Sequence, residues 1–213
     1  MKPSGDVCLI ISAMFSGEQP NWWENNGLVI CADAGFARAR SFHLQPDLVA
    51  GDFDSMKDTE LAGFTGEVIR LPVEKDDTDT LYCLKEARRR GFHKFHLLGC
   101  LGGRLDHTYA NLQALCDCAK RGEEAEMADH HHKVRIFAPG TYTIPREEDR
   151  KLSFFAYSEK ASCVELCGCK WNLHGAVLDN FYPLGVSNAW AEEEAVLSFA
   201  SGMILMIISS DPA

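Results

Sequence analysis

Short apolar runs alternate with segments of helical periodicity over the first two-thirds of the chain. The runs with the length and composition of buried strands are VCLIIS (7–12), GLVICAD (27–33), DLVAGD (47–52), EVIRL (67–71) and KFHLLG (94–99). The segments with apolar residues at helical spacing are 35–43, 78–90 and 106–121. Such alternation is typical of a parallel sheet with helices on both faces, so we predict a Rossmann-like α/β domain.

The pattern changes after about residue 132. Short strand-like runs are separated by turn residues, and no segment has convincing helical periodicity: KVRIFAPGTYTI, KLSFFAYS, ASCVELCG, AVLSFAS and GMILMIISS. This texture is typical of a small antiparallel sandwich or barrel. We therefore predict two domains, a parallel-sheet α/β domain over 1–132 and a smaller all-β sandwich over 133–213. Their boundary falls somewhere between 125 and 147.

Composition restricts the possible partners and the compartment. The chain of 213 residues carries a net charge of -10, and such a surface repels phosphate backbones, which argues against nucleic acid as a partner. No run reaches the roughly 18 apolar residues that span a membrane. The amino-terminal segment lacks the regions of a signal peptide, so we expect a cytoplasmic protein. We expect its nine cysteines to be reduced and mostly buried.

Two further groups could suggest a metal site. Cys163, Cys167 and Cys169 lie close together in the sequence, but their spacing lacks the paired C-x-x-C of common zinc sites. The histidine run at 130–132 is better explained as a solvated turn.

Acidic residues gather between positions 33 and 79. This segment has eleven acidic and five basic residues, and its net charge of -6 is more than half of the chain's total. Asp33 ends the second apolar run, and Asp52 and Asp54 end the third. The segment EKDDTDT (74–80) follows the fourth run and begins a helix. Carboxylates therefore follow three predicted strands in succession.

These loops should meet at one edge of the sheet. In a parallel sheet the carboxyl ends of all strands lie together, and ligands bind beyond them. Clustered carboxylates repel one another unless a cation joins them. Oxygen-rich sites of this kind suit Mg²⁺, which takes its remaining ligands from water and substrate phosphates. The sequence thus predicts a magnesium site that faces a phosphorylated substrate.

A fourth loop, GCLGGRLDH (99–107), follows the fifth run. Its glycines leave backbone N–H groups open, and the helix that follows favours anions at its amino end. Arg104 can form a fork of hydrogen bonds to phosphate oxygens. An acidic rim that binds Mg²⁺, opposite a glycine–arginine loop, is what a nucleoside triphosphate requires.

Each of these features also has a plain structural explanation. Asp76, Asp77 or Thr78 could cap the helix at 78, and Asp106 could cap the next one. Asp52 and Asp54 could simply form a turn. The GxxGGR pattern is weak by itself and is not the Walker motif. The combination of four such loops is much stronger than any one of them.

The ordered set of motifs resembles the thiamin pyrophosphokinase family. The matching segments are ADAG (32–35), PDLVAGDFDS (46–55), EKDDTDT (74–80), LLGCLGGRLDH (97–107), CKWNL (169–173) and LGVSNAW (184–190). The resemblance covers nearly the whole chain. It implies a Mg²⁺-dependent transfer of diphosphate from ATP to thiamin, with AMP as the other product. It also implies a homodimer with thiamin bound between the subunits.

The resemblance assigns roles to particular residues. The metal ligands it implies are Asp33, Asp52, Asp54 and Asp79. The residues it places at ATP and its phosphates are Asp76, Thr78, Gly102, Gly103, Arg104 and His107. The catalytic residues are Asp79, Arg104 and Asp106, and either of these aspartates could accept the proton of the alcohol. The residues near thiamin are Lys75, Trp171, Ser187 and Asn188.

Some positions leave the family pattern or carry a second reading. The common DGG is DAG here, with Ala34 in the middle, and we expect Gly35 to matter more. Trp171 could instead pack between sheets. Trp190 is an additional aromatic residue without an assigned role.

Three alternatives stay open at this point. A different alcohol pyrophosphokinase, for example one that acts on a pterin, would share the acidic rim. An aspartate-nucleophile phosphatase also uses two aspartates one residue apart, but usually after its first strand. A nucleotide-sensing module would need the anion loop but not so many carboxylates. Release of AMP over many turnovers, dependent on thiamin and Mg²⁺, separates them.

Overall fold

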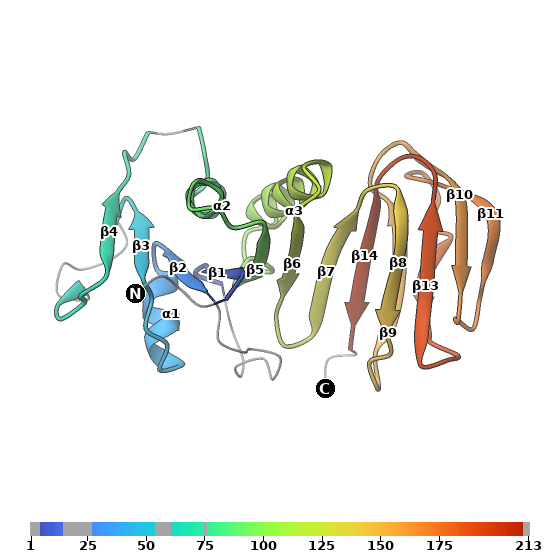
Figure 1. Ribbon diagram of the computed structural model, residues 1–213, viewed down its shortest axis with the longest axis horizontal. Helices are drawn as coiled ribbons and strands as arrows, with labels where there is room; N and C mark the ends of the chain where they lie inside the picture. Colours follow the sequence, from blue (N-terminus) through green and yellow to red (C-terminus); the bar gives the residue numbers. More distant parts are fainter. Residues whose placement is uncertain (1–4, 15–26, 54–60, 75, 211–213) are drawn as a thin grey trace. The chain divides into compact units, whose positions relative to one another are not determined.

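The computed structural model describes residues 5–14, 27–53, 61–74 and 76–210 (Figure 1). The chain has a mixed α/β fold with a large mixed sheet and a second, antiparallel sheet. It divides into two compact units. Unit 1 comprises Met1–Ala114 and Glu123–His130, and unit 2 comprises Leu115–Gly122 and His131–Ala213.

The elements of the amino-terminal part alternate as the sequence predicts. They are β1 (Val7–Ile11), β2 (Leu28–Ala32), α1 (Gly35–Ser41), β3 (Leu48–Gly51), β4 (Glu67–Arg70), α2 (Asp79–Arg89), β5 (Lys94–Leu98), α3 (Leu105–Lys120) and β6 (Glu124–Ala128). The strands follow the order β6-β5-β1-β2-β3-β4, and every pair is parallel. The predicted parallel sheet is therefore present.

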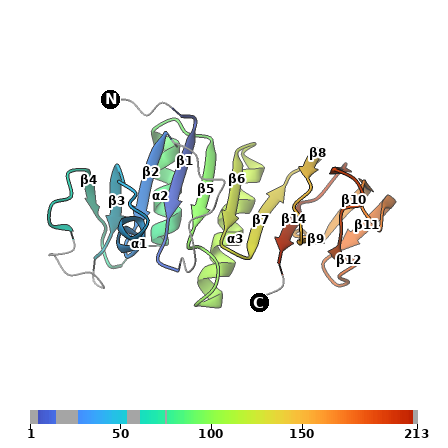
Figure 2. The same ribbon diagram turned by 90° about the horizontal axis from the view of Figure 1, so that it is seen from below.

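Helices cover both faces of this sheet. Phe36 and Ala39 of α1 pack into a buried cluster with Leu9, Ile11 and Val49, which lie on one face. The helix α2 buries Cys83, Leu84 and Ala87 and packs against β1, β2 and β3. Figures 1 and 2 show α1 and α2 on opposite sides of these strands. The alternation of side chains along each strand supplies both faces with apolar residues.

The carboxyl-terminal part consists of strands, as the sequence predicts. They are β7 (His132–Phe137), β8 (Gly140–Pro145), β9 (Lys151–Ala156), β10 (Lys160–Cys167), β11 (Leu173–Asp179), β12 (Gly185–Asn188), β13 (Glu194–Phe199) and β14 (Ile204–Ser209). The strands β7 to β14 pair with one another in antiparallel fashion. Residues of both sheets, such as Phe154, Leu166, Leu197 and Met206, form one buried cluster. The sandwich description itself stays a prediction.

Three strands were missed by the pattern of apolar residues. The strand β6 pairs with β5 although its segment, EAEMA, has only small or widely spaced apolar residues. The strands β11 and β12 have mostly exposed or half-buried side chains. The strands β6 and β12 are defined by backbone pairing with strands that are distant in sequence, and β11 by pairing with the preceding strand β10. Apolar periodicity does not reveal these pairings.

Two further findings bear on the predictions from composition. All nine cysteines are free thiols, and only Cys163 and Cys167 are exposed, as expected. In the part of the chain that the structure describes, no helix combines the length and the apolar character needed to cross a bilayer.

Candidate functional site

The loops that follow β1 to β5 lie at one edge of the parallel sheet in unit 1. Backbone hydrogen bonds connect the strand ends in sequence: Ser12 N–H donates to Leu98 O at 2.7 Å, and Asp33 N–H donates to Ala50 O at 2.8 Å. At the next pair, Leu71 N–H donates to Gly51 O at 2.9 Å. The strand order reverses between β1 and β5, and such a reversal is where open α/β sheets bind ligands.

Asp33 lies directly against the end of β3. A side-chain carbon placed on Gly51 would lie 3.0 Å from both Cα and Cβ of Asp33 and 3.1 Å from its Oδ1. Asp33 also has a left-handed backbone, with φ 44°, which aspartate and asparagine adopt more readily than most residues. Its Oδ1 atom is buried. The glycine of GDFD therefore makes room for the carboxylate of ADAG.

The glycine at the third position of DAG, Gly35, has a clear structural role. A side-chain carbon on Gly35 would lie 2.0 Å from Ile11 O, so only glycine lets α1 begin this close to the end of β1. Ala34 has φ −59° and ψ −7°, an ordinary helical conformation that tolerates a methyl group. A side chain is therefore tolerated at position 34 but not at position 35, which agrees with the expectation that Gly35 matters more than the residue before it.

The amino end of α2 reaches the end of β1. Thr80 is buried, and its hydroxyl donates to Ser12 Oγ at 3.3 Å. Burial raises the pKa of the Cys100 thiol to about 12, and a hydrogen bond with Thr80 lowers it in part. Thr80 thus lies beside the first residues of both the loop after β1 and the glycine loop. The segment between β4 and α2, called the acidic loop from here on, therefore returns from the edge strand β4 to the centre of the sheet.

The residues of the acidic loop have different environments. Thr78 caps α2, because its hydroxyl accepts a hydrogen bond from Leu81 N–H at 3.2 Å, so the capping explanation holds for this residue. Asp77 forms an ion pair with Lys85 at 2.6 Å. Asp79 lies in the first turn of α2 with its Oδ1 buried, whereas Asp76 is exposed. Asp79 is therefore the most enclosed of the three carboxylates Asp76, Asp77 and Asp79.

A side chain of α3 holds the glycine loop, which begins after β5 at Gly99. Asn111 is buried, and its side-chain amide donates to Cys100 O at 2.9 Å. Gly102, with φ 83°, has open space where a side chain would begin. Gly103, with φ 63°, is instead covered, because Met14 Cε lies 2.0 Å from the position of a side-chain carbon. The two glycines thus differ, and only Gly102 is open to a ligand at that position.

Arg104 and Asp106 form a bidentate ion pair. Arg104 Nη2 lies 2.6 Å from Asp106 Oδ2, and Arg104 Nε lies 3.1 Å from Oδ1. The hydrogen bond from Arg104 lowers the pKa of Asp106 and raises that of Arg104 in return. Asp106 Oδ1 also accepts a hydrogen bond from His107 N–H at 3.0 Å. Both charged side chains are largely exposed, so a phosphate could compete for Arg104 at little cost.

The metal ligands implied by the sequence are only partly described. Asp33 and Asp52 follow the neighbouring strands β2 and β3, and Asp52 is half-buried. Asp54 and the thiamin candidate Lys75 lie outside the described residues. Within the described ranges, no group of three or more His, Cys, Asp or Glu side chains is arranged to hold a metal ion.

Trp171 in unit 2 is an exposed aromatic side chain. It is 55% exposed, which contradicts the packing explanation. The ammonium of Lys170 lies 4.7 Å from the centre of its ring. Asn188 is only 5% exposed and holds the Trp171 backbone from both sides: Trp171 N–H donates to Asn188 Oδ1 at 3.1 Å, and Asn188 Nδ2 donates to Trp171 O at 2.7 Å. Asn188 therefore positions Trp171.

The neighbouring residues complete this picture. Ser187 is exposed and has a left-handed backbone with φ 58°, and its N–H donates to Ser153 Oγ at 3.0 Å. Trp190 belongs to the core of unit 2, where its indole N–H donates to Ile144 O at 3.1 Å. The additional tryptophan thus packs in the core, while Trp171 faces solvent.

Sequence reasoning did not identify Ser12, Met14, Thr80 or Asn111. Ser12 and Met14 follow an apolar strand and carry no charge, and Thr80 and Asn111 are single polar residues on helices. Their positions at the sheet edge depend on which strands are neighbours, and that information is not local.

An acidic sheet edge with an adjoining glycine–arginine loop, in a chain that also has a β-rich unit with an exposed tryptophan, is an arrangement typical of a transferase. Comparison with known proteins agrees. The family model described as "Thiamin pyrophosphokinase, catalytic domain" matches residues 19–127, and "Thiamin pyrophosphokinase, vitamin B1 binding domain" matches residues 141–204. The chain belongs to the thiamin pyrophosphokinase family.

Individual relatives support this assignment. A thiamine pyrophosphokinase of Bacillus subtilis is 30% identical over 191 residues, which cover 88% of this chain and 86% of the relative. The crystal structure of thiamine pyrophosphokinase from Bacillus subtilis superposes with a TM-score of 0.86 at 27% identity, covering 97% of this chain and 100% of the other. A family member from Enterococcus faecalis has a TM-score of 0.84 at 29% identity, with 98% and 100% covered.

Proposed function

We propose that this chain transfers the β,γ-diphosphate of ATP to the hydroxyethyl oxygen of thiamin, giving thiamin diphosphate and AMP. The observation that carries this proposal is the match of both family models, in order, to the two parts of the chain. The first part contains the acidic and glycine loops, and the second contains Trp171. The test is thiamin-dependent release of AMP.

The chain's own residues can perform most of the required chemistry. The alcohol oxygen of thiamin must attack the β-phosphorus in line with the departing AMP, so positioning and charge neutralisation dominate catalysis. Arg104 would exchange its partner Asp106 for phosphate oxygens, and Gly102 N–H lies in an open part of the same loop. Release of Asp106 from Arg104 would remove the contact that lowers its pKa. Asp106 and Asp79 are both candidates to accept the alcohol proton.

We also propose that the acidic edge holds Mg²⁺. The donor set suits this ion, because Asp33 and Asp52 present carboxylates after neighbouring strands and Asp33 is enclosed by Gly51. Asp79 and Asp54 would supply further oxygens in this proposal. When bound, the ion would neutralise charge on the phosphate oxygens. Asp76, Thr78 and His107 would contact ATP from the loops on either side.

Thiamin would bind at the presented tryptophan. Its cationic thiazolium and flat pyrimidine are both suited to an aromatic face. Lys170 now occupies that face, and it can leave easily because its ammonium remains solvated in either position. Ser187, next to the residue that holds Trp171, would add a hydroxyl, and Lys75 stays a proposed contact from the acidic loop.

A homodimer with thiamin between the subunits is a further part of the proposal. Unit 2 exposes large apolar side chains from just before β11 to β12: Trp171, Val177, Phe181, Tyr182, Leu184 and Val186. Both strands are at the end of their strand order, so each has an unpaired edge. Apolar surface of this kind is typical of interaction sites.

We expect the chain to form a homodimer in solution, because the exposed apolar residues of two copies would cover each other. The mass of this dimer would be about twice the 23.7 kDa of one chain. Sedimentation equilibrium at micromolar concentration measures it. A single species of 23.7 kDa across the whole concentration range would contradict the dimer.

The other functions are less well supported. A pterin pyrophosphokinase would not need the second part, which matches a vitamin B1 binding domain. An aspartate-nucleophile phosphatase usually has its aspartate pair after the first strand, whereas Asp52 follows β3. We propose that residues 1–132 form the catalytic domain and 133–213 the thiamin-binding domain, and that the enzyme works in the cytoplasm.

A further inference from the structure

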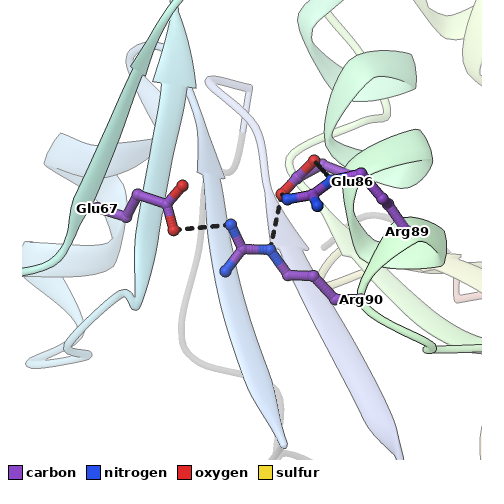
Figure 3. Close-up of polar contacts among 4 residues, drawn as sticks. All are labelled: Glu67, Glu86, Arg89 and Arg90. Atoms are coloured by element: carbon purple, nitrogen blue, oxygen red, sulfur yellow. Dashed lines mark hydrogen bonds and ion pairs between the residues drawn. The ribbon is translucent and has the colours of Figure 1, made fainter.

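A network of four charged side chains connects the far ends of β4 and α2. Arg90, at the carboxyl-terminal cap of α2, donates from Nη2 to Glu67 Oε2 at 2.7 Å, and Glu67 is the first residue of β4. Arg90 also donates from Nε to Glu86 Oε1 at 2.7 Å. Figure 3 shows the Arg90 side chain reaching away from its helix towards Glu67, with Glu86 and Arg89 above it in this view. One guanidinium therefore bridges a strand and a helix.

The strand β4 lies at the edge of the parallel sheet. It lies at the end of the strand order and pairs with β3, and none of its residues is buried. The helix α2 packs mainly against β1, β2 and β3. A short strand at a sheet edge, without buried side chains, is held mostly by its backbone pairing. The contact from Arg90 is thus a direct side-chain link between β4 and α2.

Glu86 sets the direction of the Arg90 side chain. It is 6% exposed and lies one helical turn before Arg90. It also accepts two hydrogen bonds from Arg89, at 2.8 and 2.7 Å. Hydrogen bonds from Arg89, and next from Arg90, hold the pKa of Glu86 below its ordinary value despite desolvation. The carboxylate stays charged and fixed, so Arg90 is pre-oriented towards the strand.

The acidic loop, of which residues 71–74 and 76–78 are described, follows β4 and leads into α2 at Asp79. Strand, loop, helix and the Arg90 contact therefore form a closed ring, with the acidic loop at one end and the ion pair at the other. We propose that Arg90 is a positioning residue for the acidic loop. By joining Glu67 to α2, it fixes the distance between β4 and α2, the two elements that flank the loop. That distance in turn determines where Asp76, Thr78 and Asp79 lie relative to ATP. This inference rests on the proposed function.

The chain provides a matched control for this role. Arg89 and Arg90 are neighbours, and both bind Glu86, but the described contacts take only Arg90 to Glu67. Arg89→Gln and Arg90→Gln each remove one cation from Glu86, and only the second opens the ring. Glu86 keeps its other arginine in each variant, and the Arg90–Glu67 pair is partly exposed, so both variants should fold.

The experiment compares these two variants with Glu67→Gln and the double variant Glu67→Gln/Arg90→Gln. We expect the KM for MgATP to rise about twofold to fivefold in Arg90→Gln and Glu67→Gln, which is the upper part of the range expected for a surface ion pair. The KM for thiamin and the melting temperature should change little. The double variant should be no worse than Arg90→Gln, because the two changes break the same contact.

A second measurement does not depend on activity. Hydrogen exchange of the backbone amides in the acidic loop should become faster in Arg90→Gln and Glu67→Gln but not in Arg89→Gln. Unchanged exchange and unchanged KM for MgATP in Arg90→Gln would overturn the proposal, as would equal effects of Arg89→Gln. If the unmodified chain released no AMP, the proposed function would fail, and loop exchange would still decide whether Arg90 positions the loop.

Discussion

Replacing Asp33 with asparagine should lower kcat by on the order of a thousandfold and leave the protein folded. Asparagine has the same shape as aspartate and tolerates the left-handed backbone at φ 44°, so the packing against Gly51 should survive. What disappears is the negative charge that we propose holds Mg²⁺ against the phosphates. The measurement is kcat from AMP release, with the melting temperature determined on the same preparation.

The matched control for this change is Asp77→Asn. Asp77 lies in the acidic loop and forms an ion pair with Lys85 on the protein surface, so we propose no metal-binding role for it. We expect kcat of this variant to stay within about twofold of the original, since exposed ion pairs contribute little. An Asp33→Asn enzyme with near-original turnover would exclude a metal-binding role for Asp33.

Replacing Trp171 with alanine should raise the KM for thiamin about tenfold to a hundredfold, the range expected for loss of one aromatic stacking contact. Because the side chain is exposed and outside the core cluster, its removal should not lower the melting temperature markedly. The KM for ATP should change little, because ATP is proposed to bind in unit 1. Initial rates with each substrate varied in turn measure both constants.

Trp171→Phe is the control for this prediction. Phenylalanine keeps an aromatic face, although a smaller one, and should recover part of the affinity for thiamin. Equal increases in KM for thiamin and for ATP after Trp171→Ala would instead indicate a structural role. Trp190→Phe should behave differently, because loss of its hydrogen bond to Ile144 in the core should lower stability.

The α/β part of the fold could be predicted because its strands are continuous apolar runs. VCLIIS and GLVICAD are buried on both faces, and parallel strands covered by helices require this composition. The strand β6 could not be found in this way, because EAEMA becomes a strand through pairing with β5. Likewise, β12 contains GVSN, whose one large apolar side chain, Val186, is exposed, so the segment has no apolar pattern.

The candidate site could be predicted where charge and glycine mark it. Asp33 and the GDFD aspartates stand out as carboxylates after apolar runs, and the contact between Asp33 and Gly51 supports the placement of the first two loops. Met14 over Gly103 could not be predicted, because an apolar residue after an apolar strand gives no signal. The Ser12–Thr80 contact joins residues far apart in sequence and depends on the crossover of α2.

In unit 2, motif similarity identified a region but not the role of each residue. Asn188 was assigned to thiamin, and the structure shows its side chain bound to the backbone of Trp171. That contact gives Asn188 a positioning role, and direct contact with thiamin stays a prediction. The two tryptophans show the same limit, since only tertiary structure distinguishes the buried Trp190 from the exposed Trp171.

The most direct test of the proposed function is AMP release by the purified chain with ATP, in four conditions that include or omit thiamin and Mg²⁺. We expect AMP to form over many turnovers only when both are present, with one thiamin diphosphate for each AMP. AMP or phosphate released at the same rate without thiamin, or no AMP in the complete mixture, would contradict the assignment of this chain as a diphosphate transferase acting on thiamin.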